Sequence, residues 1–445
     1  MHASRRTLVV GLRLLLVSMS AMSQAVAAQS ACTEPAIDPA DVRTWLAEVG
    51  GMDAEAHRLW GRALSGPVLF VDRATRRVVA NVADAEGRLT ACEGVYVGTL
   101  PPEQNAANTA VSWAGREWTM LLAPLPRDGY ARRRLIGHEL FHRVQPALGI
   151  PMSDPSNAHL AGRDGRIWLR LEMRALAEAL IRQRDERQTA ITDALAFRAR
   201  RQAEFGDAAS QEAALELNEG LAEYTGWRVS GLPDHVLADR AAVRLGSAEA
   251  GESFARSFAY ATGPAYALLL DDAGSPWRRG LRAGDDLAAL LARAHGISGQ
   301  LAGRADARAA AYDGAFVIAQ ETRRAERLAA RSAELRGRFI DGPTLRLPVG
   351  EPFRYSFDPN QAEPLDGVGT VYASARITDE WGVLTVEGGG VLLLRDTDGR
   401  IAGVALSLRD APAPPLHGDR WRLSLAEAWE TAAGARPRDL VARRR

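Results

Sequence analysis

The chain has 445 residues, enough for two or three domains that each bury a hydrophobic core. Its residues are 47% hydrophobic and 25% charged, a composition that excludes wholesale disorder and a membrane bundle. The formal net charge is zero, which removes the electrostatic argument for a nucleic-acid or anionic-membrane partner.

The first 28 residues are typical of an export signal. Arg5 and Arg6 precede an apolar stretch from Leu8 to Val17, and small residues follow as far as Ala28. The apolar stretch is too short to span a bilayer as a helix, so we expect no retained membrane anchor. The mature protein is therefore expected to lack residues 1–28 and to be periplasmic or extracellular.

Residues 33–129 are predicted to form an N-terminal α/β lobe. Apolar residues at helical spacing between Asp41 and Ala63 predict a helix. Short β-type runs, separated by Gly, Asn and Pro, then predict a small sheet; they are Val68–Val71, Arg77–Val82, Val95–Val97, Thr109–Trp113 and Glu117–Leu122. In an oxidising compartment Cys92 of this lobe can form a disulfide with Cys32, although the sequence does not fix the geometry of such a bridge.

Residues 130–335 are predicted to be helical, because long runs rich in Ala, Leu, Arg and Glu continue through them. The next segment, 339–445, changes to a hydrophobic period of two and is predicted to be a β-rich C-terminal domain. Together these segments predict an α+β protein.

Within the C-terminal domain, Asp398-Gly399 predicts a hairpin turn. We expect one short helix at Leu425–Ala433 and a frayed tail at Val441–Arg445. The domain could bind cell wall, glycan or a partner protein, but its large aromatic residues are more typical of a core than of a binding platform; they are Tyr355, Trp381 and Trp421.

The segment His138-Glu139-Leu140-Phe141-His142 has the spacing of a metal-binding helix with a neighbouring general base. Residues four apart lie about 40° from one another around a helix axis, so His138 and His142 can bind a single ion from one face. Neutral imidazoles suit Zn²⁺, and Glu139 beside them can take a proton from water during attack on a carbonyl. The alternative is an ordinary amphipathic helix with a solvated His-Glu pair, which the apolar neighbours Leu140 and Phe141 disfavour.

A catalytic zinc normally has three protein ligands, so a further donor is needed. Here the chain resembles the gluzincin metallopeptidases. Asn218-Glu219-Gly220 is similar to the third-ligand helix of aminopeptidase-N-like enzymes, and Glu219 followed by Glu223 is similar to the thermolysin pattern. The resemblance implies that Glu219 is the third zinc ligand and that Glu223 accepts an N–H from a ligating histidine. Gly220 would permit close approach of another helix.

Other readings of these acidic residues remain open. Glu172 or His159 could supply the third ligand instead. The acidic residues near Glu219 also recur at three- and four-residue spacing, as on a solvated helix face; they are Glu212, Glu216, Glu219 and Glu223.

The segment Tyr260-Ala261-Thr262-Gly263 resembles the Tyr-x-x-Gly segment of aminopeptidase-N-like gluzincins. The resemblance implies that Tyr260 donates a hydrogen bond to the oxyanion that forms when a carbonyl is attacked. Tyr224 and Tyr266 are alternative donors.

The resemblance covers about residues 110–270 and implies a zincin-like core, in which an N-terminal β lobe leads into active-site helices. The whole chain is also similar to a group of exported bacterial proteins with a peptidase-MA-like domain. The implied activity is zinc-dependent hydrolysis of peptide bonds in a peptide or protein substrate, with Thr109–Leu122 as the strand segment that binds extended peptide. The alternatives are a zinc hydrolase of a non-peptide amide or ester and a non-catalytic zincin-fold binding protein, although an intact Glu139 disfavours the latter.

Overall fold

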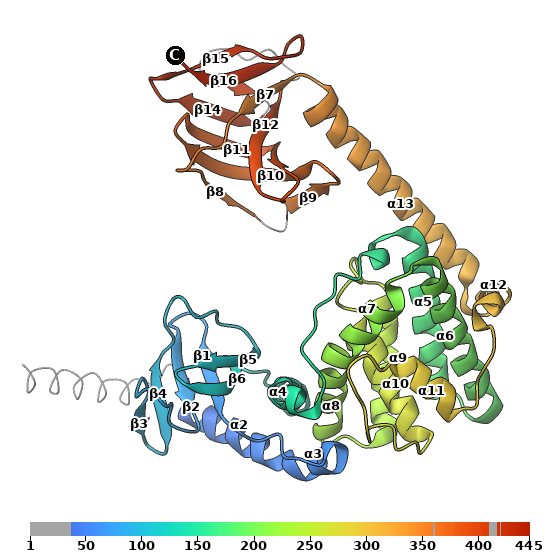
Figure 1. Cartoon of the computed structure of the whole chain (residues 1–445). Coiled ribbons are helices and arrows are strands. Elements are labelled where there is room, and N and C mark those ends of the chain that lie inside the picture. Colours follow the sequence, from blue (N-terminus) through green and yellow to red (C-terminus); the bar gives the residue numbers. More distant parts are fainter. Residues whose placement is uncertain (1–36, 359–360, 409–415, 419) are drawn as a thin grey trace, which may run out of the picture. The chain divides into compact units, whose positions relative to one another are not determined.

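The computed structural model describes residues 37–358, 361–408, 416–418 and 420–445 (Figure 1). Helices and two separate sheets occur together in these residues, which confirms the mixed α+β class.

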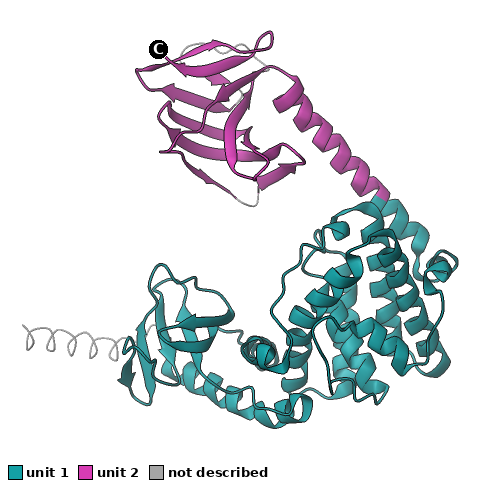
Figure 2. Cartoon of the chain, in the orientation of Figure 1, with its two compact units in different colours: residues 1–321 teal, residues 322–445 magenta. Residues whose placement is uncertain are grey.

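The chain divides into two compact units, residues 1–321 and 322–445 (Figure 2). The division falls inside the long helix α13 (Gly314–Arg336). The expected export signal, residues 1–28, and the expected disulfide partner Cys32 lie outside the described residues. In the part of the chain that the structure describes, no helix has the length and apolar character needed to cross a membrane.

The first unit begins with two helices, α2 (Pro39–Gly51) and α3 (Asp53–Trp60), where the sequence predicts one. A six-stranded sheet follows, and its spatial order is β3-β4-β2-β1-β6-β5. β1 pairs in parallel with β6, while the other neighbours are antiparallel. The strands are β1 (Val68–Asp72), β2 (Arg77–Ala80), β3 (Thr90–Cys92), β4 (Val95–Thr99), β5 (Thr109–Trp113) and β6 (Arg116–Ala123).

Five of these strands coincide with the predicted β-type runs, and β3 was missed because only three residues form it. β1 lies inside the sheet, and its residues from Val68 to Val71 are fully buried, as expected for a strand covered on both faces. On one side Phe70 packs on Trp45 of α2, with ring centroids 5.0 Å apart. This contact belongs to a core that continues into the helices that follow.

The rest of the first unit is helical, as the sequence predicts. Its helices are α4 (Gly129–Val144), α5 (Arg163–Ile181), α6 (Arg184–Glu204), α7 (Ala208–Leu215), α8 (Leu221–Val229), α9 (Asp234–Glu249), α10 (Ala259–Asp272), α11 (Leu287–Ala294), α12 (Ala305–Arg308) and the start of α13. Shorter turns link them: η1 (Gln145–Leu148), η2 (Ala158–Ala161), η4 (Leu301–Arg304) and η5 (Ala309–Tyr312) are 3₁₀, and η3 (Glu216–Gly220) is a π-helical turn.

The second unit contains a ten-stranded sheet, which follows the end of α13 and the π-helical turn η6 (Gly337–Asp341). Its path is β13-β14-β11-β12-β7-β16-β15, and β10 pairs with β11, β8 and β9. The strands are β7 (Thr344–Leu347), β8 (Arg354–Phe357), β9 (Ala362–Leu365), β10 (Gly369–Asp379), β11 (Gly382–Arg395), β12 (Ile401–Ser407), β13 (His417–Gly418), β14 (Trp421–Leu425), β15 (Trp429–Ala433) and β16 (Leu440–Arg444).

The predicted hairpin at Asp398-Gly399 is confirmed, because β11 and β12 pair antiparallel around it. Trp381 and Trp421 are buried in the core as expected, whereas Tyr355 on β8 is 43% exposed.

Two predictions for the C-terminal segment are wrong. The expected helix at Leu425–Ala433 is the end of β14 and the strand β15, and the expected frayed tail at Val441–Arg445 forms most of β16. β16 pairs antiparallel with β15 and parallel with β7. The Ala- and Glu-rich composition of Leu425–Ala433 favours a helix locally, but the pairing of β15 with β16, which itself pairs with β7, overrides this preference.

Candidate metal centre

The helix α4 carries the His-Glu-x-x-His segment. It starts at Asp128, whose side chain accepts a hydrogen bond of 2.7 Å from the backbone N–H of Ala131. Further along the helix His138, Glu139 and His142 are all buried. The alternative of a solvated His-Glu pair on an ordinary surface helix is therefore wrong.

Two glycines allow α4 to lie against α8. A Cβ atom added to Gly137 would lie 2.4 Å from Cγ2 of Val229, and one added to Gly226 would lie 2.3 Å from the carbonyl oxygen of Arg134. Any larger side chain at either position would push the helices apart. This close crossing brings Glu223 of α8 beside His138 of α4, where the two side chains contact each other.

The third acidic group comes from the π-helical turn η3. Oε2 of Glu219 lies 3.4 Å from Nε2 of His138 and 3.5 Å from Nε2 of His142, and the two Nε2 atoms are 3.1 Å apart. π-Helical turns are rare and often mark functional positions, because the extra residue changes the direction of nearby side chains. The structure thus brings together the three residues that the sequence proposes as ligands, and the group could bind a metal ion.

The other ring nitrogen of each histidine has its own acceptor. Nδ1 of His138 lies 3.2 Å from Oε2 of Glu223, and Nδ1 of His142 lies 3.0 Å from Oε1 of Gln145. When each Nδ1–H donates to these oxygens, both Nε2 lone pairs face Glu219. Glu223 is held in turn by the indole N–H of Trp227 at 2.7 Å and by Arg134.

The donors fit a divalent cation. Oε2 of Glu219 is buried and has no hydrogen-bond partner, which is costly unless something positive satisfies it. The imidazole nitrogens of His138 and His142 face the same oxygen, so the group offers two nitrogen donors and one oxygen donor to a metal ion. Burial raises the pKa of Glu219, but its interactions with the imidazoles of His138 and His142 outweigh this and hold that pKa well below the usual range.

The two residues proposed for catalysis lie beside this group. Burial raises the pKa of the Glu139 carboxyl. The Tyr260 ring stacks on the His138 ring, with centroids 5.6 Å apart and planes 6° from parallel. Burial and hydrogen bonding to Glu219 raise the pKa of the Tyr260 hydroxyl, so it stays protonated and able to donate.

Tyr260 reaches the centre because α10 approaches η3 closely. A Cβ added to Gly220 would lie 2.8 Å from Cα of Gly263, and one added to Gly263 would lie 2.4 Å from Cα of Gly220. The predicted role of Gly220 in close helix approach is confirmed, and the glycine of the Tyr-x-x-Gly segment is its partner.

These side chains line a pocket of about 330 Å³. The sheet contributes one wall through the start of β5, and the helices and their connections contribute the others. The lining residues are Asn108, Thr109, His138, Glu139, His142, Met152, Ser153, Asp154, Asn218, Glu219, Arg256 and Tyr260.

The alternative third ligands lie in a different network. Glu172 accepts from the hydroxyl of Tyr266 at 2.6 Å and pairs with Arg201 at 2.6 Å. His159 pairs with Glu212 at 2.7 Å. Neither Glu172 nor His159 belongs to the group that could hold an ion, which is the one such group among the described residues.

The alternative tyrosines are also engaged away from the centre. The Tyr224 hydroxyl donates to Asp271 at 2.6 Å, and Tyr266 donates to Glu172. The interpretation of the acidic spacing as a solvated helix face is wrong as well, because all four carboxylates are buried; they are Glu212, Glu216, Glu219 and Glu223.

The sequence analysis missed two residues that support the site, Gln145 and Arg256. Gln145 accepts from His142 and donates to Oδ1 of Asn218 at 2.9 Å, and its place one turn beyond His142 is the only local signal for it. Arg256 donates to Oε1 of Glu219 at 2.6 Å, and no sequence pattern predicts this contact.

Arg143, the residue after His142, donates hydrogen bonds to the carbonyl oxygens of Leu64 and Ser65. Its charged group therefore stabilises the segment that leads into β1.

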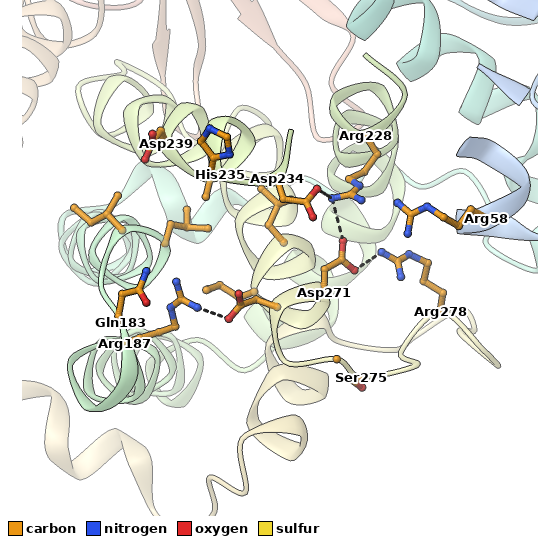
Figure 3. Close-up of a pocket in the computed structure, with 17 residues that line it drawn as sticks. Arg58, Gln183, Arg187, Arg228, Asp234, His235, Asp239, Asp271, Ser275 and Arg278 are labelled. Atoms are coloured by element: carbon orange, nitrogen blue, oxygen red, sulfur yellow. Dashed lines mark hydrogen bonds and ion pairs between the residues drawn. The ribbon is translucent and has the colours of Figure 1, made fainter. Parts of the chain in front are cut away.

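A larger pocket of about 580 Å³ lies elsewhere in the first unit (Figure 3). Three of its four arginines are paired with aspartates: Arg228 with Asp234 at 2.7 Å, Arg187 with Asp272, and Arg278 with Asp271. The fourth, Arg58, is paired with Glu55. These charges largely neutralise one another, in contrast to the converging donors of the metal centre.

No protein-family model, curated protein or solved structure matches this chain. A functional assignment therefore depends on the arrangement of its own residues.

Proposed function

We propose that the protein is an exported zinc-dependent hydrolase that cleaves peptide bonds. The observation that supports this proposal most is the convergence of two imidazole nitrogens and one unpartnered carboxylate oxygen beside Glu139. A site that only stabilises the fold usually closes with four protein ligands, whereas three ligands beside a pocket suit catalysis.

Zn²⁺ bound at this centre would polarise a substrate carbonyl and make a water molecule more acidic. His138, His142 and Glu219 would hold the ion, and Glu223 and Gln145 would keep the two imidazoles in the required tautomer and orientation.

Glu139 is the proposed general base. Its carboxylate accepts a proton from the attacking water and can pass that proton to the leaving nitrogen. Burial raises the pKa of this carboxyl above its ordinary value, which makes its carboxylate a stronger proton acceptor.

Tyr260 is the proposed oxyanion donor. Its hydroxyl keeps its proton and lies against the ligand pair of His138 and Glu219. During attack it would exchange its hydrogen bond to Glu219 for one to the developing oxyanion, where a donor contributes more than in the ground state.

The sheet edge favours a peptide over other amides and esters. β5 is at the end of the six-stranded sheet and, among the described residues, pairs with β6 alone. Thr109 at its start and the preceding Asn108 line the pocket. An extended peptide that paired with this edge would enter the pocket with its backbone aligned. The resemblance of the ligand segments to gluzincins supports the same class of reaction.

A digest of casein or a peptide library by the zinc-loaded mature protein tests the proposal. We expect cleavage that a chelator abolishes, that added zinc restores and that Glu139→Gln lacks while keeping its zinc. Products would be identified by mass spectrometry. Zinc-loaded wild type that cleaves none of the peptides, or a digest unaffected by the chelator, would contradict the proposal.

A further inference from the structure

Arg256 is the one arginine among the described residues that line the pocket of the metal centre. Its guanidinium donates through Nη2 to Oε1 of Glu219 at 2.6 Å and through Nη1 to the carboxylate of Asp154. It therefore connects the ligand group with the rim of the pocket. Neither contact uses Oε2 of Glu219, the oxygen that faces the two histidines.

The two carboxylates bound by Arg256 differ in exposure. The Glu219 side chain is 4% exposed, whereas Asp154 is 67% exposed and Arg256 itself is 51% exposed. Water competes strongly for an ion pair between exposed groups, so the Arg256–Asp154 pair is weak. A carboxylate from another molecule can therefore replace Asp154 at little cost.

Arg256 would also keep an effective positive charge in the working site. A cation shared by Glu219 and the two histidines would withdraw charge from the Glu219 carboxylate, which then neutralises Arg256 less well. The guanidinium donates strong charge-assisted hydrogen bonds to carboxylates, and its Nη1, which bonds the exposed Asp154, is the donor that an incoming carboxylate would use. The charge, the exposure and the hydrogen-bond donors of Arg256 therefore all favour the binding of a further carboxylate.

We propose that Arg256 binds a carboxylate of the substrate, so that the site prefers peptide bonds close to an anionic group. This inference rests on the proposed function and specifies its substrate class. The carboxylate can be the free C-terminus of a peptide or the side chain of an aspartate or glutamate near the cleaved bond, and the experiment distinguishes these two sources.

The test measures binding, so it does not depend on turnover. Zinc-loaded Glu139→Gln protein is titrated by calorimetry with three short alanine peptides: one blocked at both ends, one with a free C-terminal carboxylate, and one blocked peptide with a central aspartate. We expect at least one carboxylate peptide to bind at least about 10-fold more tightly than the blocked peptide, as for charge-assisted hydrogen bonds. Preference for the free C-terminus would indicate an exopeptidase, and preference for aspartate an endopeptidase.

Variants in the same Glu139→Gln background identify the group responsible. Arg256→Gln should abolish the preference while keeping the zinc content, and Arg256→Lys should retain part of it. Asp154→Asn should keep or increase the preference, because it removes the competing carboxylate without removing Arg256.

Equal affinity for the three peptides, or no binding of any of them, would overturn the inference. So would a preference that survives Arg256→Gln, or an Arg256→Gln protein that loses zinc and binds all three peptides more weakly by the same factor, since Arg256 would then only support Glu219. If the preference is present and depends on Arg256 but wild type hydrolyses nothing, the carboxylate site stands and the proposed hydrolase function fails.

Discussion

Two buried carboxylates three residues apart in the turn η3 have opposite environments. Glu216 forms two hydrogen bonds with the guanidinium of Arg198, at 2.8 and 3.0 Å, and accepts from the hydroxyl of Thr262 at 2.6 Å. Glu219 accepts from Arg256 at Oε1, but its Oε2 faces the imidazoles of His138 and His142 and has no hydrogen bond. A guanidinium cannot release its protons to bind a metal, whereas a neutral imidazole can be a ligand. Whether a buried carboxylate can help to hold an ion therefore depends on the side chains that face it, and only Glu219 of these two faces imidazoles.

The two environments also depend on each other. The Arg–Glu cluster around Glu216 is buried and draws residues from several helices; its members are Glu172, Arg198, Arg201, Glu212 and Glu216. Thr262, which bonds Glu216, lies two residues after Tyr260 on α10. The cluster therefore fixes the turn that carries Glu219 against the helix that carries Tyr260.

The largest expected effect concerns chemistry at the metal centre. Glu139→Gln should keep the fold and the zinc but lower kcat by about 10²–10⁴-fold, because an amide cannot accept the proton of the attacking water. Kinetics on a chelator-sensitive substrate, with zinc content as the control, would measure this. Full activity of the variant would exclude the proposed mechanism.

Breaking the Arg–Glu cluster should instead affect stability. Arg198→Met leaves Glu216 buried without its cation, which typically costs about 3–5 kcal/mol. Denaturant unfolding of wild type and variant would measure the loss, with a substitution of the exposed Arg43 as the control. A change below about 1 kcal/mol, comparable to an exposed pair, would show that the cluster does not hold the turn.

Tyr260→Phe tests the tyrosine on α10, the helix that contacts Glu216 through Thr262 and Glu219 through Tyr260. It removes only the hydroxyl, so zinc binding should persist while kcat falls by up to about 10²–10³-fold with less effect on KM. An unchanged kcat would assign the oxyanion to another donor.

A smaller effect is expected for the carboxylate that supports His138. Glu223→Gln keeps the size of the side chain but weakens the hydrogen bond to Nδ1, and losses of such partners reduce metal affinity by about 10–100-fold. Competition with a chromophoric chelator would measure it. A loss larger than that of Glu219→Ala would mean that the roles of the two glutamates are reversed.

The smallest effect is proton release on zinc binding. Burial lowers the pKa of His138, but the neighbouring carboxylates of Glu219 and Glu223 outweigh this and raise it to about 9 in the metal-free protein. His138 is therefore protonated at pH 7 and must lose that proton to bind zinc, so affinity should rise with pH up to about 9 and then level off. Calorimetry in buffers of different ionisation enthalpy should find about one proton released at pH 7. Identical heats in all buffers would contradict the raised pKa.

The sequence predicts those parts of the site that depend on local spacing. His138, Glu139 and His142 follow from helix periodicity, and Glu219, Glu223 and Tyr260 followed from resemblance of short segments; the structure places these side chains together. Arg256 could not be predicted, because its contact with Glu219 depends on the packing of segments far apart in the chain. The same reason explains part of the error in the second sheet, where β16 pairs with β7, about a hundred residues earlier, as well as with its neighbour β15.

Zinc content tests the central claim most directly. Wild type, Glu219→Ala and the double variant His138→Ala/His142→Ala would be purified in parallel, loaded with zinc, dialysed and analysed for metal, with circular dichroism to confirm folding. We predict about one zinc per wild-type chain, reduced retention in Glu219→Ala and none in the double variant. Equal zinc in folded wild type and folded double variant would contradict the metal centre proposed for these residues.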